Sequence, residues 1–156
     1  IGSALNQLPE RVQHCDRCGT ICTGTRCAIC LDPNRQDPVI CVVERPQDID
    51  KIEQTGGFNG TYHVLGGALS PLQGISANQL RIRELLLRLR EEPATEILIA
   101  VDPDAEGDAT AYYLAELIKP LNITVSRIAH GVAVGTEIGY ASSSSLRMAI
   151  ENRQLL

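Results

Sequence analysis

Five of the six cysteines fall within sixteen residues near the beginning of the chain. Four of them, Cys15, Cys18, Cys27 and Cys30, form two Cys-x-x-Cys pairs separated by eight residues. Two such pairs on tight turns bring four thiolates to the corners of a tetrahedron around one Zn²⁺. A disulfide scaffold, a redox-active Cys-x-x-Cys and unrelated free thiols are the alternatives, but no secretory signal supports the first. The spacing therefore predicts one structural zinc ion, with Cys22 as a surplus thiol.

Acidic side chains follow two predicted strands at the point where each strand ends. Glu44 ends the first strand, and Asp102 and Asp104 end a later one. Because the carboxyl ends of parallel strands line one crevice, we expect these three carboxylates to converge. Such a cluster repels itself unless a cation lies in it, and Mg²⁺ prefers carboxylate and water ligands. Acids at strand ends and helix starts are also common caps, so the sequence predicts at most weak Mg²⁺ binding.

The elements that must position these residues follow the pattern of an α/β domain with a mainly parallel, four-stranded sheet. The expected strands are Val39 to Val43, Thr61 to Leu65, Ile97 to Val101 and Ile123 to Ile128. The expected helices are Arg45 to Gln54, Ala77 to Glu92, Glu106 to Lys119 and a short one around Leu146 to Asn152. This order puts each predicted acidic residue directly after a strand.

Composition shifts divide the chain into four parts. Apolar residues recur at helical spacing in residues 1–14, so an N-terminal helix is predicted there. Residues 15–38 are predicted to form a four-cysteine zinc finger and a connector, in which the metal supplies most of the stability because so short a segment cannot bury a core. The α/β domain is expected to span residues 39–130. Residues 131–156 are rich in Gly and Ser before an apolar tail, which predicts a contact between subunits.

Composition also limits the class of protein. With 156 residues, 44% of them apolar and 21% charged, the chain is globular and long enough for one domain and a small appendage. No apolar run approaches the roughly 20 residues that cross a bilayer, so no membrane association is expected. The net charge of −5 means that any contact with nucleic acid must be local. Since the sequence begins with Ile1 and shows no signal peptide, we expect a cytoplasmic fragment of a longer protein.

Several separate motifs together resemble one family. Glu44 and the later Asp102-Pro103-Asp104 resemble the Toprim signature of topoisomerases, primases and related nucleases. With the four-cysteine motif, further segments narrow the resemblance to the RecR family of bacterial recombination mediators. These segments are Cys41 to Pro46, Tyr62 to Gly67, Leu69 to Leu72, Gly74-Ile75, Arg127 to Gly131 and Val134-Gly135. The resemblance covers nearly the whole chain and implies a Toprim-type α/β domain preceded by a zinc finger.

The resemblance implies a role in DNA repair. Members of the family act with RecO, and in some settings with RecF, to displace single-strand binding protein so that RecA loads on single-stranded DNA at gaps. It implies an assembly factor without catalysis, in the bacterial cytoplasm and at the nucleoid during repair. Two other classes stay open. A Mg²⁺-dependent Toprim phosphotransfer enzyme, nuclease or topoisomerase-like, explains only the acids, and a zinc-stapled protein-interaction module explains only the cysteines.

Partner contacts are expected at the acidic crevice. The residues expected to bind a protein partner are Glu44, Asp102, Asp104, Glu106 and Asp108. Arg17, Arg26 and Arg35 surround the cysteines and are the candidates for contact with nucleic acid. Arg88 and the other arginines of the helix over 77–92 are expected on a solvated face, paired with glutamates such as Glu92.

Assembly is expected from the same resemblance. Relatives begin with a helix-hairpin-helix unit that supplies much of the DNA binding and one contact between subunits. That unit is absent from this sequence, so we expect weak DNA binding. RecR-like proteins form rings, so a tetrameric ring is expected for a full-length protein and a dimer for this chain.

Overall fold

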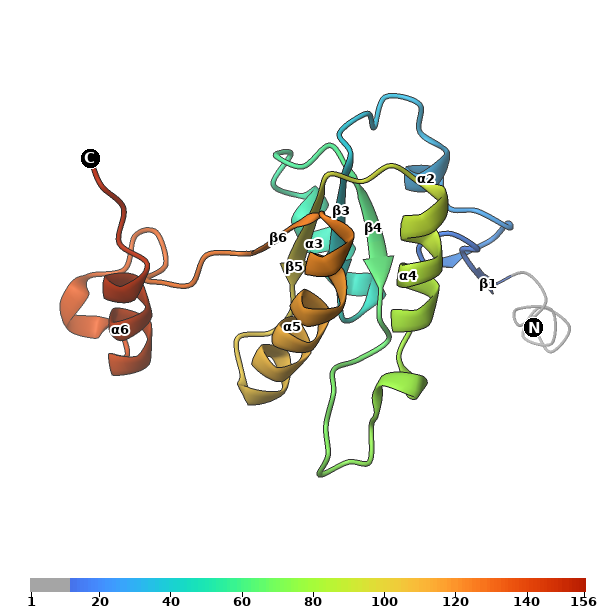
Figure 1. The fold of residues 1–156 in the computed structure, drawn as a ribbon. Coiled ribbons are helices and arrows are strands. Elements are labelled where there is room, and N and C mark those ends of the chain that lie inside the picture. The colour runs from blue at the N-terminus through green and yellow to red at the C-terminus, as the bar shows by residue number, and fades with distance from the viewer. Residues whose placement is uncertain (1–11) are drawn as a thin grey trace, which may run out of the picture. The chain divides into compact units, whose positions relative to one another are not determined.

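The computed structural model describes residues 12–156, which begin with a small antiparallel hairpin (Figure 1). β1 (Gln13–His14) pairs with β2 (Ile21–Cys22), and a short helix, α2 (Ala28–Leu31), follows. The N-terminal helix predicted over residues 1–14 lies mostly outside the described residues. Its last two positions are strand and not helix, because their backbone pairs across the hairpin.

A four-stranded sheet in the order β4-β3-β5-β6 forms the centre of the fold. The strands are β3 (Val39–Val43), β4 (Thr61–Val64), β5 (Glu96–Ala100) and β6 (Thr124–Arg127). β3 pairs in parallel with both β4 and β5. A central strand of a parallel sheet is covered on both faces, which explains why β3 is apolar throughout. The predicted α/β class and parallel sheet are confirmed.

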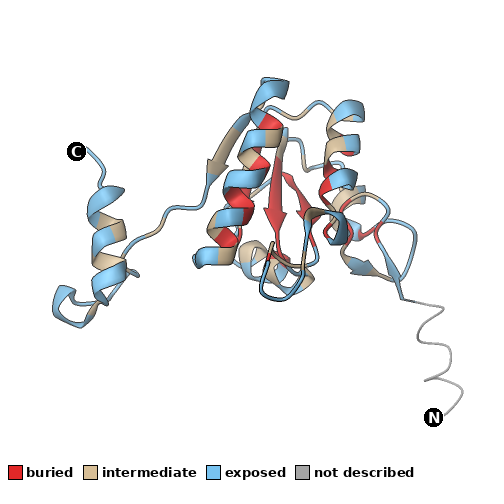
Figure 2. Ribbon diagram, turned by 60° about the horizontal axis from the view of Figure 1, so that its bottom comes forward, coloured by how far each residue is buried: buried red, intermediate tan, exposed pale blue. Residues whose placement is uncertain are grey.

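Helices cover both faces of this sheet (Figures 1 and 2). They are α3 (Pro46–Glu53), α4 (Ile82–Glu91) and α5 (Ala105–Ile118), with a 3₁₀ turn, η2 (Lys119–Leu121), after α5. On one face Leu85 of α4 and Leu114 of α5 are fully buried against the strands. On the other face Ile49 of α3 packs against Cys41, and Ile29 of α2 joins this cluster. Each such buried side chain stabilises the fold by roughly 1.5–3 kcal/mol.

The helix predicted over residues 77–92 is interrupted in the structure. A 3₁₀ turn, η1 (Ala77–Gln79), is followed by Leu80 and Arg81 in non-helical conformations before α4 begins. Leu80 is buried in the core, and the Arg81 N–H donates to the Leu65 carbonyl at 3.0 Å. In a continuous helix over 77–92, the Leu80 side chain would point away from the apolar face that packs against the sheet. Burial of this side chain therefore overrides the local helical pattern.

The end of the chain forms a second compact unit, residues 127–156. It contains a 3₁₀ turn, η3 (Ile138–Tyr140), and α6 (Ser143–Glu151), whose N-cap Ser142 accepts a hydrogen bond from the Ser145 N–H. No residue of α6 is buried, and Ile150 and Leu156 are exposed. None of the helices within residues 12–156 has the length and apolar character to span a membrane.

His63 of β4 is completely buried next to the start of α4. Its Nε2 lies 2.7 Å from the Arg81 carbonyl oxygen, and its Nδ1 has no hydrogen-bond partner. Burial, reinforced by the charge of Arg88 and opposed by the Arg81 carbonyl, lowers the pKa of His63 to about 4. The imidazole is therefore neutral at physiological pH.

This burial predicts a specific loss of stability in mild acid. As the pH is lowered from 6.5 to 4, the unfolded chain binds a proton at His63 that the folded chain does not bind. The free energy of unfolding therefore decreases by up to about 3 kcal/mol over this range. His63→Gln keeps a donor for the Arg81 carbonyl and removes the titration. Denaturant unfolding from pH 7 to 4 should show a smaller loss for the variant. Equal slopes for the two proteins would contradict the prediction.

Candidate metal centre and acidic crevice

The two Cys-x-x-Cys pairs meet in one cluster. The Sγ atoms of Cys15, Cys18, Cys27 and Cys30 all lie within 4.8 Å of one another, and those of Cys18 and Cys27 are 3.7 Å apart. Sulfurs at the usual Zn–S distance in a tetrahedron are separated by about 3.8 Å, so the donor set fits one Zn²⁺. Cys22 stands apart, since its thiol donates to the Gly24 carbonyl at 3.0 Å.

The close packing of these thiols gives them different pKa values. Burial opposes ionisation of Cys15, but the backbone N–H groups of Cys18, Cys27 and Arg17 outweigh it and lower the pKa of Cys15 to about 6. Burial raises the pKa of Cys27 to about 11. The contact with Cys18, followed by burial, raises the pKa of Cys30 well above its usual range. Four adjacent sulfurs therefore ionise together only with a cation among them, which a zinc ion would supply.

Two arginines fasten the zinc module, residues 15–38, to the helices of the α/β domain. Arg17 forms a bidentate pair with Glu92, at the end of α4, with N···O distances of 2.7 and 2.8 Å. Arg35 pairs with Glu53 of α3 and donates to the Gly60 carbonyl at 3.1 Å. Both arginine side chains are less than one quarter exposed. The structure thus places both as bridges between segments far apart in the sequence.

Arg26 differs from these two arginines because its partner lies inside the zinc module. Its guanidinium contacts the Asp16 carboxylate at 2.8 and 3.2 Å. The side chains of Arg26 and Asp16 are 44% and 46% exposed. Exposed pairs of this kind contribute little to stability, so Arg26 is the arginine of the three that is available to an external anion.

Glu44, Asp102 and Asp104 lie at the carboxyl ends of β3 and β5, and this group of carboxylates is called the acidic crevice. Glu44 is buried and accepts the Asp102 N–H at 3.2 Å, and burial is the main cause that raises its pKa. The Asp102 carboxylate contacts Arg45 at 3.1 Å. Asp104 caps α5 by accepting the Gly107 N–H at 2.7 Å.

In this arrangement each carboxylate of the crevice has a protein partner. Within residues 12–156, the group of ligating side chains close enough to share an ion is the four-cysteine cluster. The three carboxylates do not form a second such group, and Asp102 is already in contact with Arg45. Magnesium binding here stays a prediction from the sequence.

The two other predicted acids lie in the first turn of α5. Glu106 accepts the Ser70 hydroxyl at 2.8 Å, and the Leu69 N–H donates to Thr110 Oγ1 at 2.9 Å. These contacts fasten the long loop after β4 to α5 beside the crevice. The Asp108 N–H donates to the Asp104 carbonyl at 2.8 Å and continues the helix.

Two residues of the site are not found by the sequence reasoning. A Cβ atom on Gly107 would lie 1.8 Å from the Asp102 carbonyl oxygen, so this glycine permits α5 to approach the strand end. The feature of the sequence that could have indicated Gly107 is a glycine between two acidic residues at the start of a predicted helix. The second residue is Arg88, expected on a solvated face but only 6% exposed. It donates to the Tyr62 carbonyl at 2.6 Å and to Thr61 Oγ1 at 2.7 Å, partners that helical spacing cannot reveal.

Comparison with known proteins agrees with this arrangement. Residues 38–129 match the Toprim domain family. The recombination protein RecR of Thermobifida fusca is 49% identical over 154 residues, which cover 99% of this chain and 77% of that protein. The chain belongs to the RecR family. The RecR proteins of Acidothermus cellulolyticus and Carboxydothermus hydrogenoformans are each 47% identical over 156 residues, which cover 100% of this chain and 78% of each protein.

The four-cysteine cluster predicts about one zinc ion per chain in freshly purified, reduced protein. Cys15→Ser removes one ligand and should abolish most of the bound zinc. Cys22→Ser removes the thiol outside the cluster and serves as the matched control, with zinc content unchanged. Elemental analysis of the three proteins measures this directly. Wild-type protein without zinc, or zinc loss in Cys22→Ser, would refute the assignment of ligands.

Proposed function

We propose that this RecR-family chain is a non-catalytic mediator of DNA recombination and repair in the bacterial cytoplasm, at the nucleoid during repair. It acts with RecO, and in some settings with RecF, to help load RecA on single-stranded DNA at gaps. The observation that carries the proposal is the identity of 47–49% over essentially the whole chain to proteins named RecR. The cysteine cluster beside a Toprim-type sheet supports the same conclusion.

The acidic crevice is the proposed docking surface for RecO. Asp102 is 44% exposed, and Glu106 and Asp108 extend the negative charge along the first turn of α5. Negative charge of this density attracts a basic surface and sets the rate and specificity of association. The helix cap and the loop anchors hold these carboxylates in place, which lowers the entropic cost of docking.

Charge removal at the crevice tests this assignment. Asp104→Asn retains an oxygen that caps α5, and Glu44→Gln retains an acceptor for the Asp102 N–H, so both variants should fold. We expect each to weaken RecO binding by about threefold to tenfold, most clearly at low salt. Glu116→Gln, an exposed acid farther along α5, is the control. Calorimetric titration with purified RecO measures the affinities, and unchanged values for both crevice variants would contradict the docking site.

The alternative function is Mg²⁺-dependent phosphoryl transfer at the same carboxylates. Two features favour mediation without catalysis: the Arg45 contact of Asp102 and the helix cap made by Asp104. Metal-dependent cleavage of DNA by wild-type protein that disappears in Asp102→Ala would overturn the non-catalytic proposal.

DNA contact by this chain is proposed to be weak and local. Arg26 is the exposed candidate on the zinc module. Arg17 and Arg35 are engaged by Glu92 and Glu53, so either would have to leave a carboxylate to reach a phosphate.

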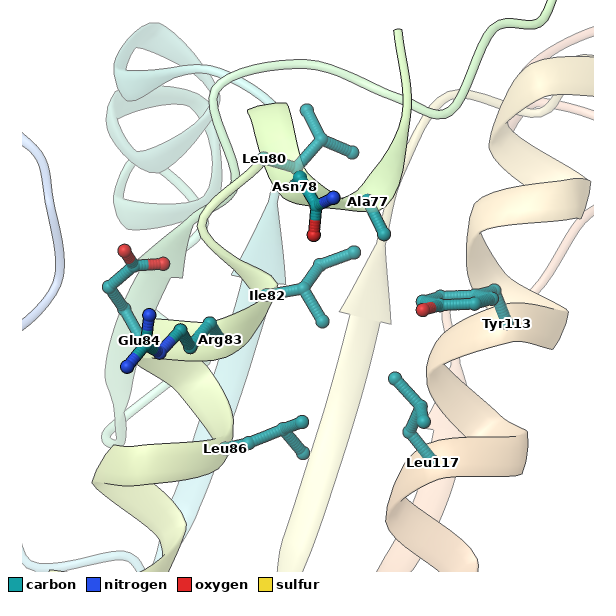
Figure 3. Close-up of a pocket in the computed structure, with 9 residues that line it drawn as sticks. All are labelled: Ala77, Asn78, Leu80, Ile82, Arg83, Glu84, Leu86, Tyr113 and Leu117. Atoms are coloured by element: carbon teal, nitrogen blue, oxygen red, sulfur yellow. The ribbon is translucent and has the colours of Figure 1, made fainter.

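A dimer is the proposed unit of assembly for this chain, and a tetrameric ring for a full-length protein. Residues 127–156 bury little of their own apolar surface, and Ile150, Leu155 and Leu156 are exposed. A groove of about 470 Å³ between α4 and α5 offers an apolar surface to such a segment of a second copy. Figure 3 shows Ile82 and Leu86 of α4 facing Tyr113 and Leu117 of α5 across it.

Deletion of the residues after Ser145 tests this assembly. Burial of a few apolar side chains contributes roughly 1.5–3 kcal/mol each, so their removal should convert the dimer to a monomer at tens of micromolar. Light scattering over a concentration series measures the mass of both proteins. A monomeric parent chain, or a dimer that survives the deletion, would contradict the model.

A further inference from the structure

β4 is an edge strand, so the outward N–H and C=O groups of its backbone need partners other than a neighbouring strand. The Tyr62 carbonyl accepts Arg88 Nη1 at 2.6 Å, and the Val64 N–H donates to the Cys18 carbonyl at 2.7 Å. Arg88 is buried, and so is Cys18. Figure 1 shows α4 and the zinc module beside this strand. The edge is thus closed by a side chain of α4 and by the backbone of a predicted zinc ligand.

A partly buried ionic bridge connects Arg88 to the zinc module. Glu92 accepts both Arg17 of the zinc module, at 2.7 and 2.8 Å, and Arg88, at 3.1 Å. Arg88 also donates to Thr61 Oγ1 at the start of β4. Burial opposes ionisation of Glu92, but the two guanidinium groups outweigh it and hold its pKa below the usual range. The carboxylate is therefore charged at neutral pH and ties the module to the group that closes the edge.

The turn that carries Cys18 also fits closely against the start of α4. Gly19 adopts φ of +84°, and a Cβ atom there would lie 2.4 Å from Arg81 Nε. Arg81 in turn donates its backbone N–H to the Leu65 carbonyl, at the residue that follows β4. The turn that carries Cys18 and the end of β4 are therefore both in contact with Arg81.

We propose that the zinc module is the cover of the open sheet edge, and that zinc binding and closure of the β4 edge are energetically coupled. Cys18 contributes its sulfur to the metal site and its carbonyl to Val64, so loss of the metal frees the turn and uncovers the strand. An uncovered edge strand can pair with a strand of another chain. Because coupling is reciprocal, weakening the Glu92 bridge must also lower the affinity for zinc. This inference does not depend on the proposed function.

Amide hydrogen exchange tests the effect of the metal on the edge. Zinc-loaded protein is compared with the same protein after treatment with a chelator, and loss of zinc is verified by elemental analysis. The Val64 amide should exchange at least about tenfold faster without zinc, while the amides of central strand β5 keep their protection. Unchanged exchange at Val64 would overturn the proposal. Equal acceleration in β5 would also overturn it, because that indicates global unfolding.

The reverse effect is tested outside the metal ligands. Glu92→Gln removes the charge that holds Arg17 and Arg88, and should lower the zinc affinity by about threefold to tenfold, measured by equilibrium competition with a chromophoric chelator. Glu91→Gln changes the neighbouring exposed acid of α4 and is the matched control, with an unchanged affinity. Circular dichroism shows that both variants are folded before the measurement. Equal zinc affinities of Glu92→Gln and wild type would refute the coupling.

Discussion

Four sulfur atoms within 4.8 Å of one another can carry negative charge together only when a cation lies among them. This constraint determines the conformation of the first part of the chain, because residues 15–38 contain too few apolar side chains to hold a turn by packing. The β1–β2 hairpin, α2 and the connector all follow from the need to bring two pairs of cysteines to one point. The rest of the module faces the α/β domain through Cys18, Arg17 and Arg35.

The parallel sheet imposes the second constraint. With both faces of β3 and β5 covered by helices, polar groups concentrate at the strand ends, where chain segments turn toward the helices. Glu44, Asp102 and Asp104 come together there for this reason, and each finds a partner in the protein. The same geometry gives the charged surface on which the proposed docking of a partner depends, and a metal ion there would meet carboxylates that already contact Arg45 and the N-terminus of α5.

The metal centre and the acidic crevice are connected through the first two strands of the sheet. The Val64 N–H contacts the zinc module, and two residues later the Gly66 N–H donates to the Glu44 carbonyl at 2.9 Å. β4 and the residues directly after it therefore contact both sites. Such a framework suits the mediator role proposed above, because docking surfaces that are held in place lose less entropy on binding.

Local features of the sequence were sufficient to predict the α/β class, the grouping of the four cysteines and the position of the acids at the strand ends. Cysteine spacing, apolar runs and acids directly after strands are signals that involve residues a few positions apart. The interruption at Leu80 and Arg81 was not predictable in this way, since it follows from burial against the rest of the core.

Only the tertiary structure decided the roles of the arginines. Arg17 meets a carboxylate 75 residues away and Arg35 one 18 residues away, and buried Arg88 closes the edge of a strand that precedes it by 26 residues. Likewise, Gly107 is required because a helix and a strand end approach closely. Spacing along the chain determines which groups can act within one element, whereas long-range packing determines which charges are withdrawn from water and which stay available to a partner.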